Sequence, residues 1–229
     1  HMHNMLLQNG FNPERVHKIP YFSKFWAHAT ETIDKRRGAG QSRPLEFLFS
    51  GQAVTGKGLE ILVRALTGLR GDWRLDVYSQ GPRLAPAQEL AARLGIKDRI
   101  TFHGWVNHTG LAAAYARADV FIIPSIWDDP GPLVGVEALS FATPVIGFAV
   151  GGIPDYMIDG KTGYLVTSIT ASGLHKALQE CLDHPERLGT MGVTGQRLVA
   201  AVHGMDKHAG KIWEIYENLL QNRQKRKTS

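Results

Sequence analysis

Short apolar runs alternate with amphipathic stretches from Leu45 to about residue 166. Five runs have the length and β-branched content typical of buried strands. They lie at residues 45–50, 74–79, 99–104, 119–123 and 143–148, and a shorter one lies at 164–166. The stretches between them favour helices, which are expected at 58–69, 86–94, 111–117 and after Pro132. This alternation predicts a doubly wound, Rossmann-like α/β fold, in which helices cover both faces of a parallel sheet.

The two ends of the chain have a different pattern. Residues 5–22 contain a helix-like stretch and a possible strand at Arg15–Pro20, and residues 35–44 form a basic, Gly-containing linker. After Thr170 only helices are expected, and the last of them has one apolar face. That face consists of Ile212, Ile215, Tyr216, Leu219 and Leu220. It packs either on this domain or on a second one.

Composition is that of an ordinary globular protein. The chain has 229 residues, of which 43% are hydrophobic and 21% charged, enough for one large domain. The single Cys181 excludes an internal disulfide framework, and no stretch approaches the roughly 18 apolar residues of a membrane helix. The start of the chain lacks signal-peptide architecture, and His1-Met2 resembles a cloning scar. We therefore expect a cytoplasmic protein.

The net charge of +5 is modest, and a basic cluster near the end of the chain supplies much of it. The cluster consists of Arg223, Lys225, Arg226 and Lys227. It forms either a solvated helix end or a peripheral contact with an anionic membrane surface. Elsewhere the positive charge is scattered and is not interleaved with aromatic residues, so nucleic-acid binding is not expected.

The loop after the first strand of the main body nearly matches a P-loop. Gly51, Gly56 and Lys57 are in place, but Gly58 stands where a P-loop needs Ser or Thr for Mg²⁺. A P-loop enzyme usually also has a strand that ends in Asp, whereas Asp119 begins its strand. A nucleoside triphosphatase is therefore not expected. Lys57 at the start of a helix suits a diphosphate held together with free amides; the alternative is a surface lysine.

Dinucleotide and metal sites lack their sequence signatures. No G-x-G-x-x-G follows the first strand, and Gly151-Gly152 alone does not replace it. Asp128 and Asp129 are adjacent, so a metal-dependent D-x-D site is not expected. Two histidine pairs are five residues apart instead of the four that suit zinc on one helix face: His103 with His108, and His203 with His208. We expect no required metal or other cofactor.

The segment Pro124–Glu137, PSIWDDPGPLVGVE, contains the clearest candidate chemistry. Pro132 suits the first position of a helix, which leaves the next amides free for a phosphate. Asp129 lies just before this helix and Glu137 about one and a half turns inside it. Carboxylates beside a phosphate site suit a ligand that joins phosphate to a neutral polyol. A nucleoside diphosphate sugar is such a ligand.

Four segments resemble, in order, motifs of the retaining group 1 glycosyltransferases, in the C-terminal, donor-binding half of their GT-B fold. SGQAVTGKGLEILVRAL resembles the Gly-Arg…Lys-Gly opening of that half, and RITFHGWV its Phe-x-Gly-x-Val loop. DVFIIPSIWDDPGPLVGVEAL resembles the E-x7-E motif, and TPVIGFAVGGIPDYMIDGKTGYLV the Gly-Gly element that follows. NMLLQNGFNPERVHKIPYF is similar to the end of the N-terminal half.

The resemblance implies three parts of the chain. Residues 1–44 are the cloning scar, the end of the N-terminal half and the interdomain linker. Residues 45–205 are the nucleotide-sugar-binding domain. Residues 206–229 are a crossover helix, which packs on the N-terminal acceptor domain that this chain lacks, and a basic tail.

The resemblance also assigns roles to residues. Lys57 would hold the diphosphate beside Gly51 and Gln52. The distal phosphate would contact the backbone of Gly131, Pro132, Leu133 and Val134. Glu137 would bind the ribose, Asp129 the transferred sugar, and the backbone at Trp105 and Val106 the base. Lys57, Asp129 and Glu137 are thus the candidate catalytic residues.

Three positions depart from the family pattern. Gln52 replaces an arginine that often partners the lysine, which removes a permanent charge from the diphosphate site. Asp129 is one methylene shorter than the usual glutamate. Pro132 replaces a glycine, so one backbone donor is absent.

The implied function is retaining transfer of a hexose from a nucleoside diphosphate in polysaccharide or glycolipid synthesis. A UDP-sugar is the favoured donor and a GDP-sugar the next. In isolation the chain would be inactive or weakly active. The sequence leaves open a sugar-nucleotide-binding module without transfer activity, an interaction domain that uses its apolar terminal helix, and a GT-B epimerase.

Overall fold

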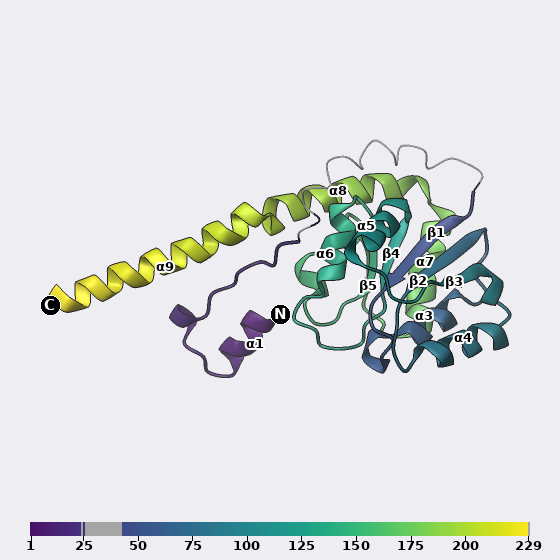
Figure 1. Ribbon diagram of the computed structural model, residues 1–229, viewed down its shortest axis with the longest axis horizontal. Coiled ribbons are helices and arrows are strands. Elements are labelled where there is room, and N and C mark those ends of the chain that lie inside the picture. Colours follow the sequence, from purple (N-terminus) through teal and green to yellow (C-terminus); the bar gives the residue numbers. More distant parts are fainter. Residues whose placement is uncertain (24, 26–42, 229) are drawn as a thin grey trace.

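A computed structural model describes residues 1–23, 25 and 43–228. Within these residues, six strands form one parallel sheet in the order β3-β2-β1-β4-β5-β6 (Figure 1). The strands are β1 (Leu45–Ser50), β2 (Trp73–Tyr78), β3 (Ile100–Phe102), β4 (Val120–Ile123), β5 (Val145–Phe148) and β6 (Gly163–Val166). The chain runs outward from β1 to β3, returns to the centre at β4 and runs outward again to β6. The predicted doubly wound fold is confirmed, with its topological switch point between β1 and β4.

Helices cover both faces of the sheet (Figure 1). They are α3 (Leu59–Leu66), α4 (Leu84–Arg93), α5 (His108–Arg117), α6 (Leu133–Ser140), α7 (Ala171–Asp183) and α8 (Glu186–His203). The apolar core accordingly has two parts. Phe47 and Phe49 pack with α3, α4 and α7, whereas Leu48 packs with α5 and α6 on the opposite face. Successive strand residues point to opposite faces, so the apolar residues of β1 contribute to both parts.

Cys181 lies in α7 and is completely buried in the first part of the core. Burial is the main reason why the pKa of its thiol is raised, and the charge of Glu180 adds to the effect. In this environment the cysteine acts as a small apolar side chain.

The N-terminal segment differs from its prediction. It contains α1 (Met2–Gln8) and a 3-10 turn at Pro13–Arg15, and the possible strand at Arg15–Pro20 is wrong. The carbonyls of Pro20, the last residue of the predicted strand, and of the adjacent Tyr21 accept hydrogen bonds from imidazoles instead. His203 Nδ1 donates to the carbonyl of Tyr21 and His208 Nδ1 to that of Pro20, each at 2.7 Å. Most of the predicted linker, residues 35–42, lies outside the described residues.

The last helix, α9 (Met205–Thr228), extends away from the body of the protein (Figure 1). The predicted apolar stripe does not pack on the domain along most of its length. Its exposed members are Tyr216, Leu219 and Leu220, and Trp213 beside them is exposed as well. In the described part of the chain, no helix combines the length and apolar character needed to cross a membrane.

Candidate functional site

The loop after β1 brings Lys57 to the centre of the sheet edge. Lys57 ends a 3-10 turn, Thr55–Lys57, and Gly58 follows in a left-handed conformation with φ +72°. A Cβ atom at Gly58 would lie 1.8 Å from the carbonyl oxygen of Pro124, at the end of β4. The close approach is reinforced by Ser125, whose Oγ donates to the carbonyl of Gly56 at 3.1 Å. The loops after β1 and β4 therefore pack directly on each other.

The loop after β4 is also held by the loop after β5. The amide of Gly152 donates to the carbonyl of Asp129 at 2.8 Å. A Cβ atom at Gly151 would lie 2.2 Å from that same carbonyl oxygen, and one at Gly152 would lie 2.0 Å from the carbonyl oxygen of Pro130. The two glycines thus have a packing role. Three loops at the carboxyl ends of adjacent strands fix the backbone position of Asp129.

Asp129 and Lys57 form an ion pair across these loops. Lys57 Nζ lies 2.9 Å from Asp129 Oδ2, and the amide of Gly131 donates to Asp129 Oδ1 at 3.2 Å. Burial, the largest single influence, acts to raise the pKa of the Asp129 carboxyl. The hydrogen bonds from Lys57 and Gly131 and the charge of Lys57 outweigh it and hold that pKa below its ordinary value. The pair lies at the mouth of the cleft, with exposed side-chain fractions of 29% and 28%.

Helix α6 supplies free amides and the second carboxylate. Pro132 was predicted to be the first residue of the helix but precedes it as the N-cap, and the helix begins one residue later, at Leu133. The amides of Leu133 and Val134 are in its first turn, where N–H groups have no acceptor within the helix. Further along, the hydroxyl of Tyr115 donates to Glu137 Oε2 at 3.3 Å. Burial, with the nearby charge of Glu137, raises the pKa of Tyr115 well above its ordinary value, so it stays a neutral donor.

These groups line one cavity of about 370 Å³. Seven of the predicted site residues border it: Gly51, Lys57, Asp129, Pro132, Leu133, Val134 and Glu137. Gln52 is exposed outside the lining, and Trp105 and Val106 lie on the loop between β3 and α5, where Trp105 is 68% exposed. Gly131 borders a neighbouring pocket. The structure therefore brings together the proposed phosphate and sugar groups but leaves the proposed base contacts outside the cavity.

Sequence reasoning missed His108 and Leu111, which border the cavity from α5. His108 had been considered only as a metal ligand, because its spacing from His103 was the visible pattern. The useful signal was Asn107, which caps α5 by accepting the amide of Gly110 at 3.0 Å. With Asn107 as the N-cap, α5 begins at His108, three residues before the predicted start. The first turn of α5 therefore borders the cavity at the strand ends.

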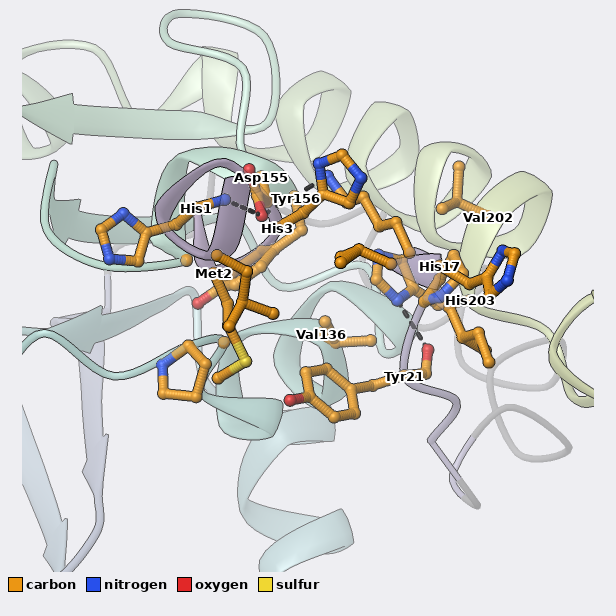
Figure 2. Close-up of a pocket in the computed structure, with 18 residues that line it drawn as sticks. His1, Met2, His3, His17, Tyr21, Val136, Asp155, Tyr156, Val202 and His203 are labelled. Atoms are coloured by element: carbon orange, nitrogen blue, oxygen red, sulfur yellow. Dashed lines mark hydrogen bonds and ion pairs between the residues drawn. The ribbon is translucent and has the colours of Figure 1, made fainter. Parts of the chain in front are cut away.

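A smaller pocket of about 200 Å³ is bordered by Pro130 and Gly131. Figure 2 shows the residues that line this pocket. The N-terminal segment forms one wall, and the ring of Tyr21 packs so closely on Gly131 that a Cβ there would lie 3.1 Å from it. Figure 2 shows His203 directed at the carbonyl of Tyr21 and the N-terminus directed at Asp155. The pocket therefore backs the loop that carries Asp129.

Comparison with known proteins identifies a family. Residues 31–197 match the family model described as "Glycosyl transferases group 1". The chain is 33% identical over 177 residues to the GDP-mannose-dependent alpha-(1-6)-phosphatidylinositol monomannoside mannosyltransferase of Mycolicibacterium smegmatis, covering 73% of this chain and 46% of the relative. The chain spans about half the length of the curated relatives that it matches.

Solved structures show the same fold. A glycosyltransferase from Rickettsia africae ESF-5 superposes with a TM-score of 0.84 at 19% identity, covering 96% of this chain and 62% of that one. Anabaena HepE, crystallised in complex with UDP, superposes with a TM-score of 0.77 at 18% identity, covering 96% of this chain and 61% of that one. At such identities the likeness establishes the fold alone.

Proposed function

The chain belongs to the group 1 glycosyl transferases, and we propose that its cavity binds the nucleoside diphosphate sugar from which such an enzyme transfers a hexose. One observation carries the proposal: Lys57, the free amides at the start of α6, and the carboxylates of Asp129 and Glu137 border a single cavity at the switch point of the sheet. Ligands bind at this position in open α/β sheets.

Each group suits one part of such a ligand. An ammonium and helix N-terminal amides together suit a diphosphate. Glu137, which is oriented by Tyr115, lies far enough along α6 to accept hydrogen bonds from ribose hydroxyls. Asp129 stands where the transferred sugar would follow the distal phosphate.

The proposed reaction is transfer of the hexose with retention of configuration. The bond between the sugar and the distal phosphate breaks while a bond forms from the sugar to an acceptor hydroxyl, whose proton passes to the departing diphosphate or to water. Negative charge develops on that diphosphate as it departs. Preorganised amides and Lys57 stabilise that charge in a partly enclosed site, which is the main contribution that this half of an enzyme can make. The acceptor would bind to a part of the full-length protein outside this chain.

Two nucleotides are candidates for the donor. The sequence favoured UDP, and the Anabaena structure contains UDP. The Mycolicibacterium relative uses GDP-mannose, and its sequence is the more similar of the two. The proposed ligand is therefore a nucleoside diphosphate hexose, and the test includes both nucleotides.

Thermal unfolding of the chain should separate these donors. A ligand present at about 100 times its dissociation constant stabilises the folded state by about 2.7 kcal/mol, which for this size corresponds to a rise in Tm of roughly 5 to 10 °C. UDP, GDP, ADP and their hexose conjugates are compared, and a rise is expected with one base. If none of them raises Tm, the proposal fails and a role as an interaction module is favoured instead.

Helix α9 supports a further part of the proposal, that its apolar face packs on the acceptor domain of the full-length protein. Tyr216, Leu219 and Leu220 are exposed on one face, and α9 projects beyond the body. We expect no sedimentation of the chain with vesicles of anionic phospholipid at physiological salt. Sedimentation that is lost in a Leu219→Ser, Leu220→Ser variant would show instead that this face binds a membrane surface.

A further inference from the structure

We propose that Asp129 makes the site select the intact donor over the free nucleoside diphosphate, because sugar hydroxyls replace the partner that Asp129 loses to the diphosphate. The inference rests on the proposed function and adds a role in specificity. It starts from the Lys57–Asp129 ion pair, which joins the group proposed for the diphosphate to the group proposed for the sugar.

In the ligand-free chain both oxygens of the Asp129 carboxylate have donors. Oδ2 accepts from Lys57 Nζ at 2.9 Å and Oδ1 from the amide of Gly131 at 3.2 Å. A diphosphate arriving beside Lys57 competes for the same ammonium. Lys57 has three N–H groups and could contact both partners, but the carboxylate and the phosphate would then lie next to each other as like charges. Either arrangement makes the free diphosphate a poor ligand.

The backbone of Asp129 cannot shift to relieve this conflict. Its carbonyl accepts the amide of Gly152 at 2.8 Å, and the backbone of Gly151 approaches it too closely to allow even a Cβ atom. Only 28% of its side chain is exposed, so solvent replaces a lost partner incompletely. New donors must therefore come from the ligand.

An intact donor provides them. Sugar hydroxyls donate hydrogen bonds to a carboxylate without adding negative charge, so Lys57 can transfer to the diphosphate while Asp129 keeps its hydrogen bonds. After the sugar has left, the diphosphate again faces a carboxylate that has lost the hydroxyls which had replaced Lys57. The exchange thus favours binding of the donor and release of the product.

The test is calorimetric titration of Asp129→Asn with UDP, GDP, their hexose conjugates and inorganic pyrophosphate. The amide keeps an oxygen for Gly131 but removes the charge. We expect affinity for the free diphosphates to rise about tenfold, the effect of removing one adjacent like charge, while affinity for the conjugates does not rise. Asp129→Ser also removes the charge, so it should raise the affinity for free diphosphates relative to the conjugates in the same way. It takes the place of Asp129→Asn if the Asn variant does not fold.

The matched control is Asp128→Asn. Asp128 is the preceding residue, its side chain is 56% exposed, and it pairs with His1 instead of Lys57. The Asp128→Asn variant removes the same charge close to the site. It should change the affinities for free diphosphates and for conjugates by less than about twofold. Equal changes in affinity for free diphosphates and conjugates, or weaker diphosphate binding in the Asp129 variants, would overturn this inference. Either result would leave the proposed function standing. If no nucleotide binds to the unmodified chain or to the variants, the proposed function fails with it.

Discussion

Replacing Lys57 by alanine should lower the affinity of the chain for nucleoside diphosphates and their hexose conjugates by about 10- to 100-fold. The ammonium is the one cationic side chain among the residues described as lining the cavity, histidine aside. Charge-assisted hydrogen bonds to phosphate are about twice as strong as neutral ones, and a half-enclosed site weakens the competition from water. Calorimetric titration with the preferred base measures the change directly.

Lys176→Ala is the matched control for this prediction. Lys176 is exposed on α7, away from the cavity, so its loss removes the same charge without touching the site. The control should bind nucleotides as the unmodified chain does. Both variants should stay folded, because a partly exposed ion pair contributes about 1 kcal/mol or less to stability. Unchanged affinity in Lys57→Ala would refute the assignment of the diphosphate site.

Replacing Gly58 by alanine should lower the free energy of unfolding by about 3 kcal/mol, the combined cost of a left-handed alanine and an overpacked contact. The methyl group would lie 1.8 Å from the carbonyl oxygen of Pro124, so the loops after β1 and β4 would have to separate. For a chain of this length the loss corresponds to a fall in Tm of roughly 6 to 12 °C. Thermal unfolding without ligand is the measurement.

Gly68→Ala isolates the cause of this effect. Gly68 has nearly the same conformation, φ +78°, but a Cβ there would have no atom within 4 Å. This variant therefore carries the backbone strain without the steric overlap, and should lose about 1 kcal/mol. If the two variants lose the same stability, the contact between the loops is not what fixes Gly58.

The fold was predictable because its pattern is local. Strands buried on both faces are short and apolar throughout, and the residues that separate them have helical spacing, so the alternation is visible without any knowledge of contacts. The helix in the segment Pro124–Glu137 was predictable for the same reason, although it begins one residue later than predicted. A strand end, a proline and two carboxylates at fixed spacing determine where Asp129 and Glu137 lie relative to one helix.

Contacts between distant segments were not predictable in this way. Lys57 and Asp129 are 72 positions apart, and nothing in either segment indicates that they pair. The carbonyls of Pro20 and Tyr21 bind imidazoles more than 180 positions away, a partner that a strand pattern cannot reveal. Gly58 was predictable in part. Its departure from the P-loop pattern was visible in the sequence, but the need for glycine comes from a tertiary contact, the close approach of the carbonyl of Pro124.

The environment of Cys181 has a practical consequence for labelling experiments. Thiol reagents attack the thiolate, and a buried thiol whose pKa is raised supplies very little of it while the protein is folded. The sequence contains no other cysteine. A thiol reagent would therefore react almost exclusively with a cysteine introduced at the exposed position of Trp127. A fluorophore attached there would report movements of the loop beside Asp129 without first removing the natural thiol.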